Sequence, residues 1–154
     1  MEIKNQVDFD RIFREVCTQV IDDVTGLALL KIKEIVKKKV YDAYMPTSYE
    51  RLGENGGLLG AWVGGIDASG GKIEGYVEHE PQMMDYVPEK LQHGNLAEGD
   101  MRDYIAMYIE QGDVHGDAGA RPFWDFFVEN VGTHLLDTWI RQAFVRHGLS
   151  GRRL

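Results

Sequence analysis

The chain has 154 residues and a mass of 17.5 kDa, which fits one domain and leaves no room for two independent cores. Its 44% hydrophobic and 27% charged residues are typical of a soluble globular protein and exclude a disordered chain, a collagen and a disulfide scaffold. No uncharged stretch approaches the ~20 residues of a membrane-spanning helix, and the N-terminus lacks the order of a secretion signal. We therefore expect a single domain over residues 1–154 that stays in the cytoplasm and does not enter a membrane.

The net charge of −8 is concentrated in the middle of the chain. Residues 41–120 carry 15 acidic and 4 basic side chains, which argues against a surface that reads DNA. The one basic run has five lysines between Lys31 and Lys39. Because they fall at the end of a predicted helix, where the helix dipole favours cations, we interpret them as a solvated helix end. A phosphate-binding patch is the alternative.

Residues 1–40 are expected to form one long helix, because apolar residues recur at steps of three and four. These positions are Phe9, Ile12, Phe13, Val16, Val20, Val24, Leu27, Leu30, Ile35 and Val36. Asp8 can cap the start, and Gly26 is a point where the helix could bend. A length of roughly 45 Å exceeds what a small core needs, so part of one face should meet something else in this chain or another. The single cysteine, Cys17, lies within the apolar stripe and is interpreted as packing.

Residues 53–112 are expected to form an antiparallel sheet. Nine of the 18 glycines lie between Gly53 and Gly75, a density that breaks helices and suits turns. Residues 58–66 and 72–78 show the two-residue period of strands on either side of a segment of turn residues, which predicts a hairpin. Prolines and glycines predict a long loop over residues 81–100.

Residues 101–111 fit both a helix face and a two-sided strand, and we favour the strand. A last helix is expected over residues 122–148, with Pro122 in its first turn, a broad apolar stripe and Gly148 just after its end. The order of elements predicts an α+β domain whose C-terminal helix packs on the sheet.

Motifs that carry chemistry are weak. Residues 65–73 superficially suggest a phosphate-binding loop, but the lysine is misplaced and a strand pattern follows it. The better candidate is a possible cation site, which could also support metal-assisted hydrolysis and consists of Glu110, Asp113, His115 and Asp117. We interpret it as a solvated turn. The five histidines show no ligand spacing, and no catalytic triad can be proposed, so no enzyme activity, metal or cofactor is expected.

An aromatic cluster opens the last predicted helix, and it consists of Phe123, Trp124, Phe126 and Phe127. Such a cluster is either core or a hot spot for binding a partner. Core is the commoner role at the start of an amphipathic helix. Trp124 falls off the apolar stripe and is the candidate for contact with a partner.

Two stretches together resemble a motif of long-tailed bacteriophage proteins. Residues 104–112 read as a strand with Tyr, Glu and Gly, and after a short loop residues 120–124 place Arg-Pro-Phe at the start of the last helix. Residues 56–59 resemble the glycine-plus-leucine strand start of the same family, and residues 41–51 are similar to a linker of many prophage members. The family is that of the neck and tail-completion proteins, which lie where the capsid portal meets the tail.

The resemblance implies a structural protein of the virion that assembles as a ring, contacts other neck or tail proteins and has no catalytic residues. It implies that Glu110, Arg121, Pro122 and Phe123 serve the fold or an interface. DNA would pass through such a ring without sequence-specific binding, after assembly in the host cytoplasm. The loop over residues 81–100 is longer than is usual in this family.

Acidic walls repel phosphate, so part of the acidic segment is expected to line or flank the channel. The candidate residues are Glu74, Glu78, Glu80 and Asp85. The main alternative function is a small acidic protein that binds and inhibits a host protein. Self-assembly separates the two, because an inhibitor should stay a small soluble unit until its target appears.

Overall fold

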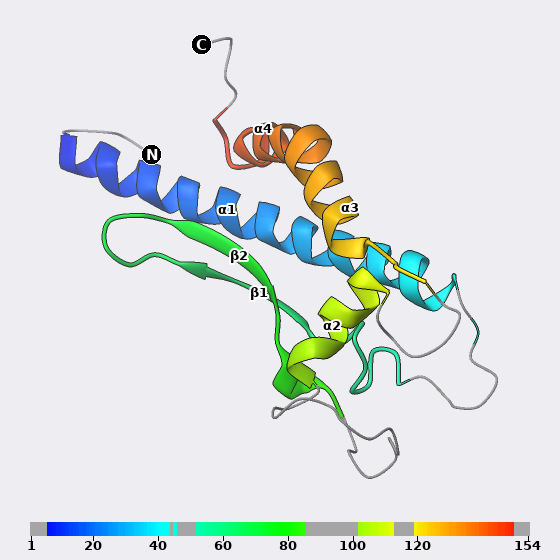
Figure 1. Cartoon of the computed structure of the whole chain (residues 1–154). Coiled ribbons are helices and arrows are strands. Elements are labelled where there is room, and N and C mark those ends of the chain that lie inside the picture. The colour runs from blue at the N-terminus through cyan, green and yellow to red at the C-terminus, as the bar shows by residue number, and fades with distance from the viewer. Residues whose placement is uncertain (1–5, 44, 46–51, 86–101, 113–118, 150–154) are drawn as a thin grey trace.

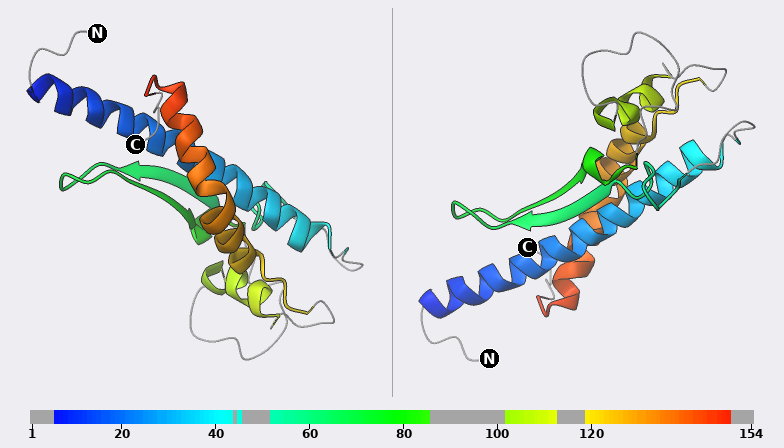
Figure 2. Two further views of the ribbon diagram at one scale, coloured as in Figure 1. Left: turned by 90° about the horizontal axis from the view of Figure 1, so that it is seen from above. Right: turned by 90° about the horizontal axis from the view of Figure 1, so that it is seen from below.

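The computed structural model describes residues 6–43, 45, 52–85, 102–112 and 119–149. It confirms the α+β class, with one long helix, a two-stranded antiparallel sheet and a set of C-terminal helices (Figure 1). The long helix lies between the sheet on one side and the C-terminal helices on the other (Figure 2). Helices make up most of the described chain.

The predicted first helix is confirmed as α1, Gln6–Val36, which continues into one π-helical turn, η1, Lys37–Tyr41. Its 31 residues span about 46 Å. Gly26 does not interrupt the helix. Its position is exposed, and a side chain there would meet nothing within 4 Å. The apolar stripe is therefore continuous along the whole element.

The predicted hairpin is confirmed, with β1 at Trp62–Asp67 and β2 at Glu74–His79. Trp62 pairs with His79 at the open end and Asp67 with Glu74 beside the turn. The first strand is shorter than expected, because residues 58–60 lie in a turn in which Leu58 and the next leucine are both buried. A strand would have placed these neighbours on opposite faces.

Glycines let the hairpin approach α1 closely. A Cβ added at Gly75 would collide with the hydroxyl of Thr25 and lie 2.9 Å from Cγ2 of Ile21. A Cβ at Gly64 would lie 3.3 Å from Cγ2 of the same threonine. Both glycines therefore occupy the sheet face that packs on the helix, and their missing side chains set the distance between sheet and helix.

The expectation of a strand over residues 101–111 is wrong, because Arg102–Gln111 form the helix α2. Ile105, Ala106 and Ile109 pack against the core together, as residues three and four apart do on one helix face. Gly112 ends the helix at φ 83°, and its N–H donates to the carbonyl of Tyr108. Of the predicted loop, residues 81–85 are described and contain the short 3-10 helix η2, Pro81–Met83, while residues 86–101 lie outside the described part.

The predicted last helix is present as three consecutive segments. These are α3 (Phe123–Asn130), the π-helical η4 (Val131–Leu135) and α4 (Leu136–Arg146). Gly148 follows with a φ of 86°, as expected for a helix end. Phe123 brings α3 against Trp62 of the sheet, whereas α4 packs along α1.

The buried residues form two clusters. The larger one joins the C-terminal half of α1 to the sheet and α3, and contains Ile32, Ile35, Val36, Val40, Leu58, Leu59, Ala61, Trp62, Met84, Phe123, Phe127 and Val131. The smaller one joins α1 to α4 and consists of Val20, Val24 and Ala143.

A polar contact fixes the end of α4. The carboxylate of Asp23 on α1 accepts a hydrogen bond from Nη1 of Arg146 at 2.6 Å and lies 3.0 Å from Nε2 of His147. The hydrogen bond with His147, and after it the charge of Arg146, hold the pKa of the Asp23 carboxyl below its usual value. The link is therefore made by the ionised carboxylate.

We predict that Gly75→Ala lowers the free energy of unfolding by about 1–3 kcal/mol, because the new methyl group overpacks the contact with Thr25. Gly26→Ala is the matched control, in open space on α1, and should raise it by up to ~1 kcal/mol. Urea denaturation measures both. Equal effects of the two substitutions would contradict the close approach of the hairpin.

The link from Asp23 to α4 should weaken in acid. Because the pKa of Asp23 is lowered in the folded state, its stabilisation is present above about pH 4, the carboxyl pKa of an unfolded chain, and is lost as the pH falls through the folded value. The stability difference between the wild type and Asp23→Asn, measured by urea denaturation, should therefore shrink at low pH. Asp22→Asn, at an exposed neighbour, should show no such pH-dependent difference.

Candidate interaction site at the junction of the helices

The side chain of Glu110, on α2, caps the next helix. One carboxylate oxygen accepts a hydrogen bond from the backbone N–H of Trp124 at 2.9 Å, and the other accepts one from Asp125 at 3.2 Å. The N-cap residue of α3 is Pro122, whose side chain makes no capping bond. A carboxylate from a neighbouring helix therefore satisfies amide groups of the first turn and complements the helix dipole.

Arg121 joins the same junction to the end of the long helix. Its backbone N–H donates to the carbonyl of Ile109, and its guanidinium donates to the carbonyl of Val40 in η1 at 3.5 Å. Pro122 follows with φ −71°, and Phe123 is only 1% exposed in the main core. The residues carried over from the phage resemblance therefore fasten α2, α3 and the end of α1 to one another.

A pocket of about 430 Å³ lies beside this junction, between the hairpin, α2 and α3. The indole rings of Trp62 and Trp124 stack there with their centroids 5.6 Å apart. The lining is mostly apolar and consists of Trp62, Val77, Glu78, His79, Ala106, Met107, Glu110, Phe123 and Trp124. Trp124 is 37% exposed, so the ring expected to contact a partner lies at a surface hollow.

The possible cation site is only partly described. Glu110 is engaged in capping α3, and Asp113, His115 and Asp117 lie outside the described residues. Within the described ranges, no group of three or more potential metal ligands occurs.

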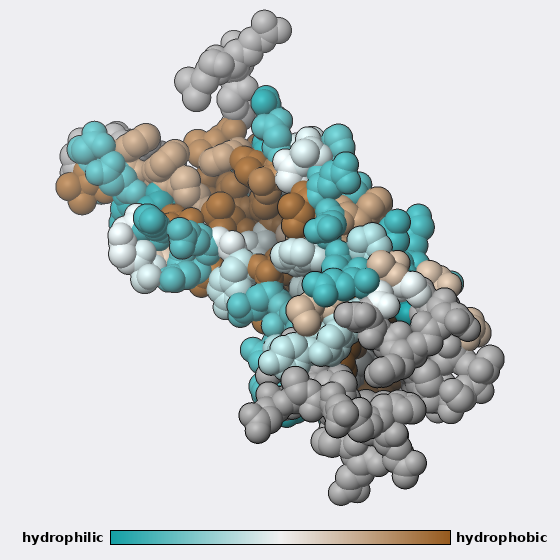
Figure 3. All heavy atoms as spheres, viewed as in Figure 1, coloured by the Kyte–Doolittle hydropathy of each residue, from teal (hydrophilic) through white to brown (hydrophobic). Residues whose placement is uncertain are grey.

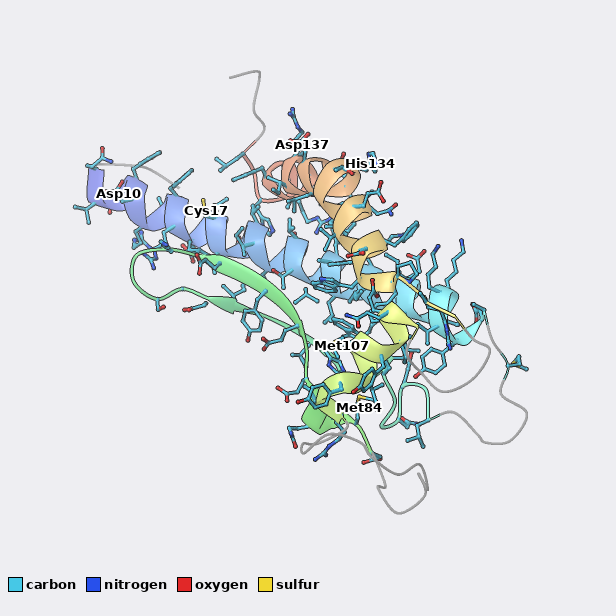
Figure 4. The ribbon with its side chains drawn as sticks, viewed as in Figure 1. Asp10, Cys17, Met84, Met107, His134 and Asp137 are labelled. Carbon is cyan, nitrogen blue, oxygen red and sulfur yellow. The ribbon has the colours of Figure 1, made fainter. Side chains whose placement is uncertain are left out.

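Burial raises the pKa of the Cys17 thiol, which disfavours the reactive thiolate. Cys17 on α1 and His134 on η4 lie on different elements (Figure 4).

The four acidic residues expected at a channel are placed differently from one another. Glu74 and Glu78 point from β2 away from α1, whereas Glu80 follows the strand and is half-buried. Asp85 lies beyond η2, and its side chain is against Gly56. Asp67 lies on β1, directly opposite Glu74 of β2. The sequence does not predict this acidic pair, because only the strand register reveals it.

An apolar strip runs along the side of α1 that faces α4, opposite the hairpin. Phe9 and Phe13 share a helix face with Val16, Val20 and Val24, and the last two are buried under α4. The two phenylalanine rings stack at 5.8 Å and are about half exposed. Figure 3 shows the apolar surface where α1 and α4 meet. The face that the sequence expected to meet something else therefore extends past the cover that α4 provides.

A family model described as YomN matches residues 8–143, which include the apolar strip, the hairpin and the junction. The chain belongs to the YomN family. No curated protein and no solved structure matches it. In this YomN-family chain, none of the described helices is long and apolar enough to span a membrane.

We predict that Glu110→Ala lowers the free energy of unfolding of this YomN-family domain by about 1 kcal/mol, because two amide groups of α3 lose their acceptor. Glu110→Gln keeps one acceptor oxygen and should lose less. Urea denaturation measures both changes. Glu129→Ala, at an exposed position on α3, is the control, and a loss as large in this control would contradict the capping role.

Proposed function

We propose that this chain is a structural subunit of the phage neck or tail junction, acting in head-tail joining or tail completion by ring assembly and not by catalysis. Membership of the phage-associated YomN family supports a phage role. The resemblance of residues 104–112 and 120–124 to neck proteins supports the place in the virion. Its partners are copies of itself and other neck or tail proteins.

The observation that carries the proposal is the uncovered apolar strip of α1. Stacked aromatic rings at 45% and 46% exposure lie in line with residues that α4 buries. Aromatic residues of this kind are enriched where proteins contact partners, and contiguous apolar patches mark such surfaces. A second chain that covers Phe9 and Phe13 would complete an interface that α4 begins.

The contacts of two charged side chains at the junction support a non-catalytic role. Glu110 is committed to the first turn of α3, and Arg121 to the end of η1. In both places the charged group satisfies backbone atoms of the fold. The acidic balance of the molecule suits a ring through which DNA passes without being held.

The alternative is a small protein that binds and inhibits a host protein. The Trp62 and Trp124 pocket favours it, because a single aromatic hollow with a polar rim suits one side chain of a partner. Such a protein would remain monomeric in the absence of its target.

We predict that the wild type forms rings, seen by light scattering behind size exclusion and by negative-stain microscopy, alone or on purified phage tails. Phe9→Ser with Phe13→Ser should raise the concentration needed for assembly at least about tenfold, because the apolar contact is lost. Leu30→Ser with Val128→Ser removes exposed apolar side chains elsewhere and is the control. A wild type that stays monomeric at every concentration and binds no neck or tail protein would contradict the proposal.

A further inference from the structure

The hairpin has one face that packs on α1 and one that is exposed over most of its length, with α2 near only its Glu78 end. On the face toward α1, the glycines let the helix pack closely. The other face carries Val63, Gly65 and Asp67 from β1 and Glu74, Tyr76 and Glu78 from β2. We name this second surface the open hairpin face. The ring of Tyr76, 45% exposed, lies over Gly65 at its centre, and carboxylates surround it.

The charges on the open hairpin face are unfavourable for the isolated molecule. Asp67 and Glu74 are directly opposite each other, and like charges in such a cross-strand pair destabilise a sheet. Asp67 accepts a hydrogen bond from the backbone of Ser69, which lowers its pKa and keeps it ionised. Within the described part of the chain, no cation forms an ion pair with Glu74 or Glu78. A cationic partner would remove this repulsion.

A matching cationic surface occurs on the same chain. Lys37 and Lys38, in η1, are exposed and form no ion pair with any described residue. Two other lysines of this run are engaged, because Lys31 pairs with Glu34 and Lys39 lies 4.2 Å from the ring centre of Phe126. We name Lys37 and Lys38 the lysine end.

The two surfaces lie toward opposite ends of the molecule. The hairpin turn lies beside the N-terminal half of α1, and the lysine end is at the C-terminal end of this helix (Figures 1 and 2). One molecule therefore cannot bring its own two surfaces together. Contact between unlike surfaces of successive copies is a head-to-tail interface, which closes into a ring when the rotation between copies permits.

We propose that the open hairpin face of one copy binds the lysine end of the next copy. This inference rests on the proposed self-assembly and names a contact that holds it together. Glu78 also lines the tryptophan pocket, so a lysine that reaches this end of the face finds a carboxylate beside aromatic rings. Such surroundings accommodate both the ammonium group and the aliphatic stem of a lysine.

Zero-length carbodiimide crosslinking tests the contact directly, because it joins only carboxylates and amines that touch. Isotopically heavy and light chains are mixed, so that mass spectrometry separates links between chains from links within one. We expect heavy-to-light links from Glu74 or Glu78 to Lys37 or Lys38. Their yield should fall as salt is raised, because exposed ion pairs are screened.

Charge reversal tests the energetic role. Glu74→Lys with Glu78→Lys, and separately Lys37→Glu with Lys38→Glu, should each raise the concentration needed for assembly about tenfold. Mixing the two variants restores opposite charges at every contact and should restore assembly. Glu15→Lys with Glu129→Lys makes the same change in net charge at other exposed positions and should assemble as the wild type does.

The outcomes separate this inference from the proposed function. If both charge-reversal variants assemble as readily as the wild type, this inference alone is overturned, and the hypothesis that Glu74 and Glu78 line a channel is the one that remains. Failure of the mixed variants to assemble, while each remains folded by circular dichroism, overturns it as well. A wild type that neither assembles nor forms links between chains overturns the inference together with self-assembly.

Discussion

The long helix α1 is the element on which every other part of the structure depends. A two-stranded hairpin is marginal by itself, and here it is supported by close contact between its glycines and Thr25. On the opposite side, Val20 and Val24 provide the surface that α4 covers. The hairpin and α4 are therefore both positioned by the same helix.

The junction of α2 and α3 is held by polar contacts between residues that are separated in the sequence. Glu110 and the segment 121–125 are separated by a loop, yet the carboxylate of one caps the helix that the other begins. Arg121 then ties that helix start to the carbonyl of Val40. Because a misplaced α3 would expose Phe123, these polar contacts fix the position of the largest fully buried side chain. A motif built in this way carries information about architecture.

Periodicity predicted the elements whose two faces differ in polarity. The first helix, the second strand of the hairpin and the last helix all show such a difference, and all are present. It failed over residues 101–111, where nearly every position from Tyr104 to Ile109 is apolar and both periods fit. The partner of Trp124 could not be predicted, since Trp62 reaches it only after the hairpin folds back on α3. Asp67 was missed for the same reason, because cross-strand pairing depends on register.

The number of surfaces that the fold leaves uncovered helps to distinguish the two candidate functions. The apolar strip faces the side of α1 on which α4 packs, while the open hairpin face lies on the side of the sheet remote from α1. A protein that inhibits one target needs one such surface. A subunit within a head-to-tail ring needs two unlike surfaces, because each copy contacts its two neighbours through different faces. Two uncovered surfaces of unlike chemistry, one aromatic and one acidic, therefore favour the assembling subunit over the inhibitor.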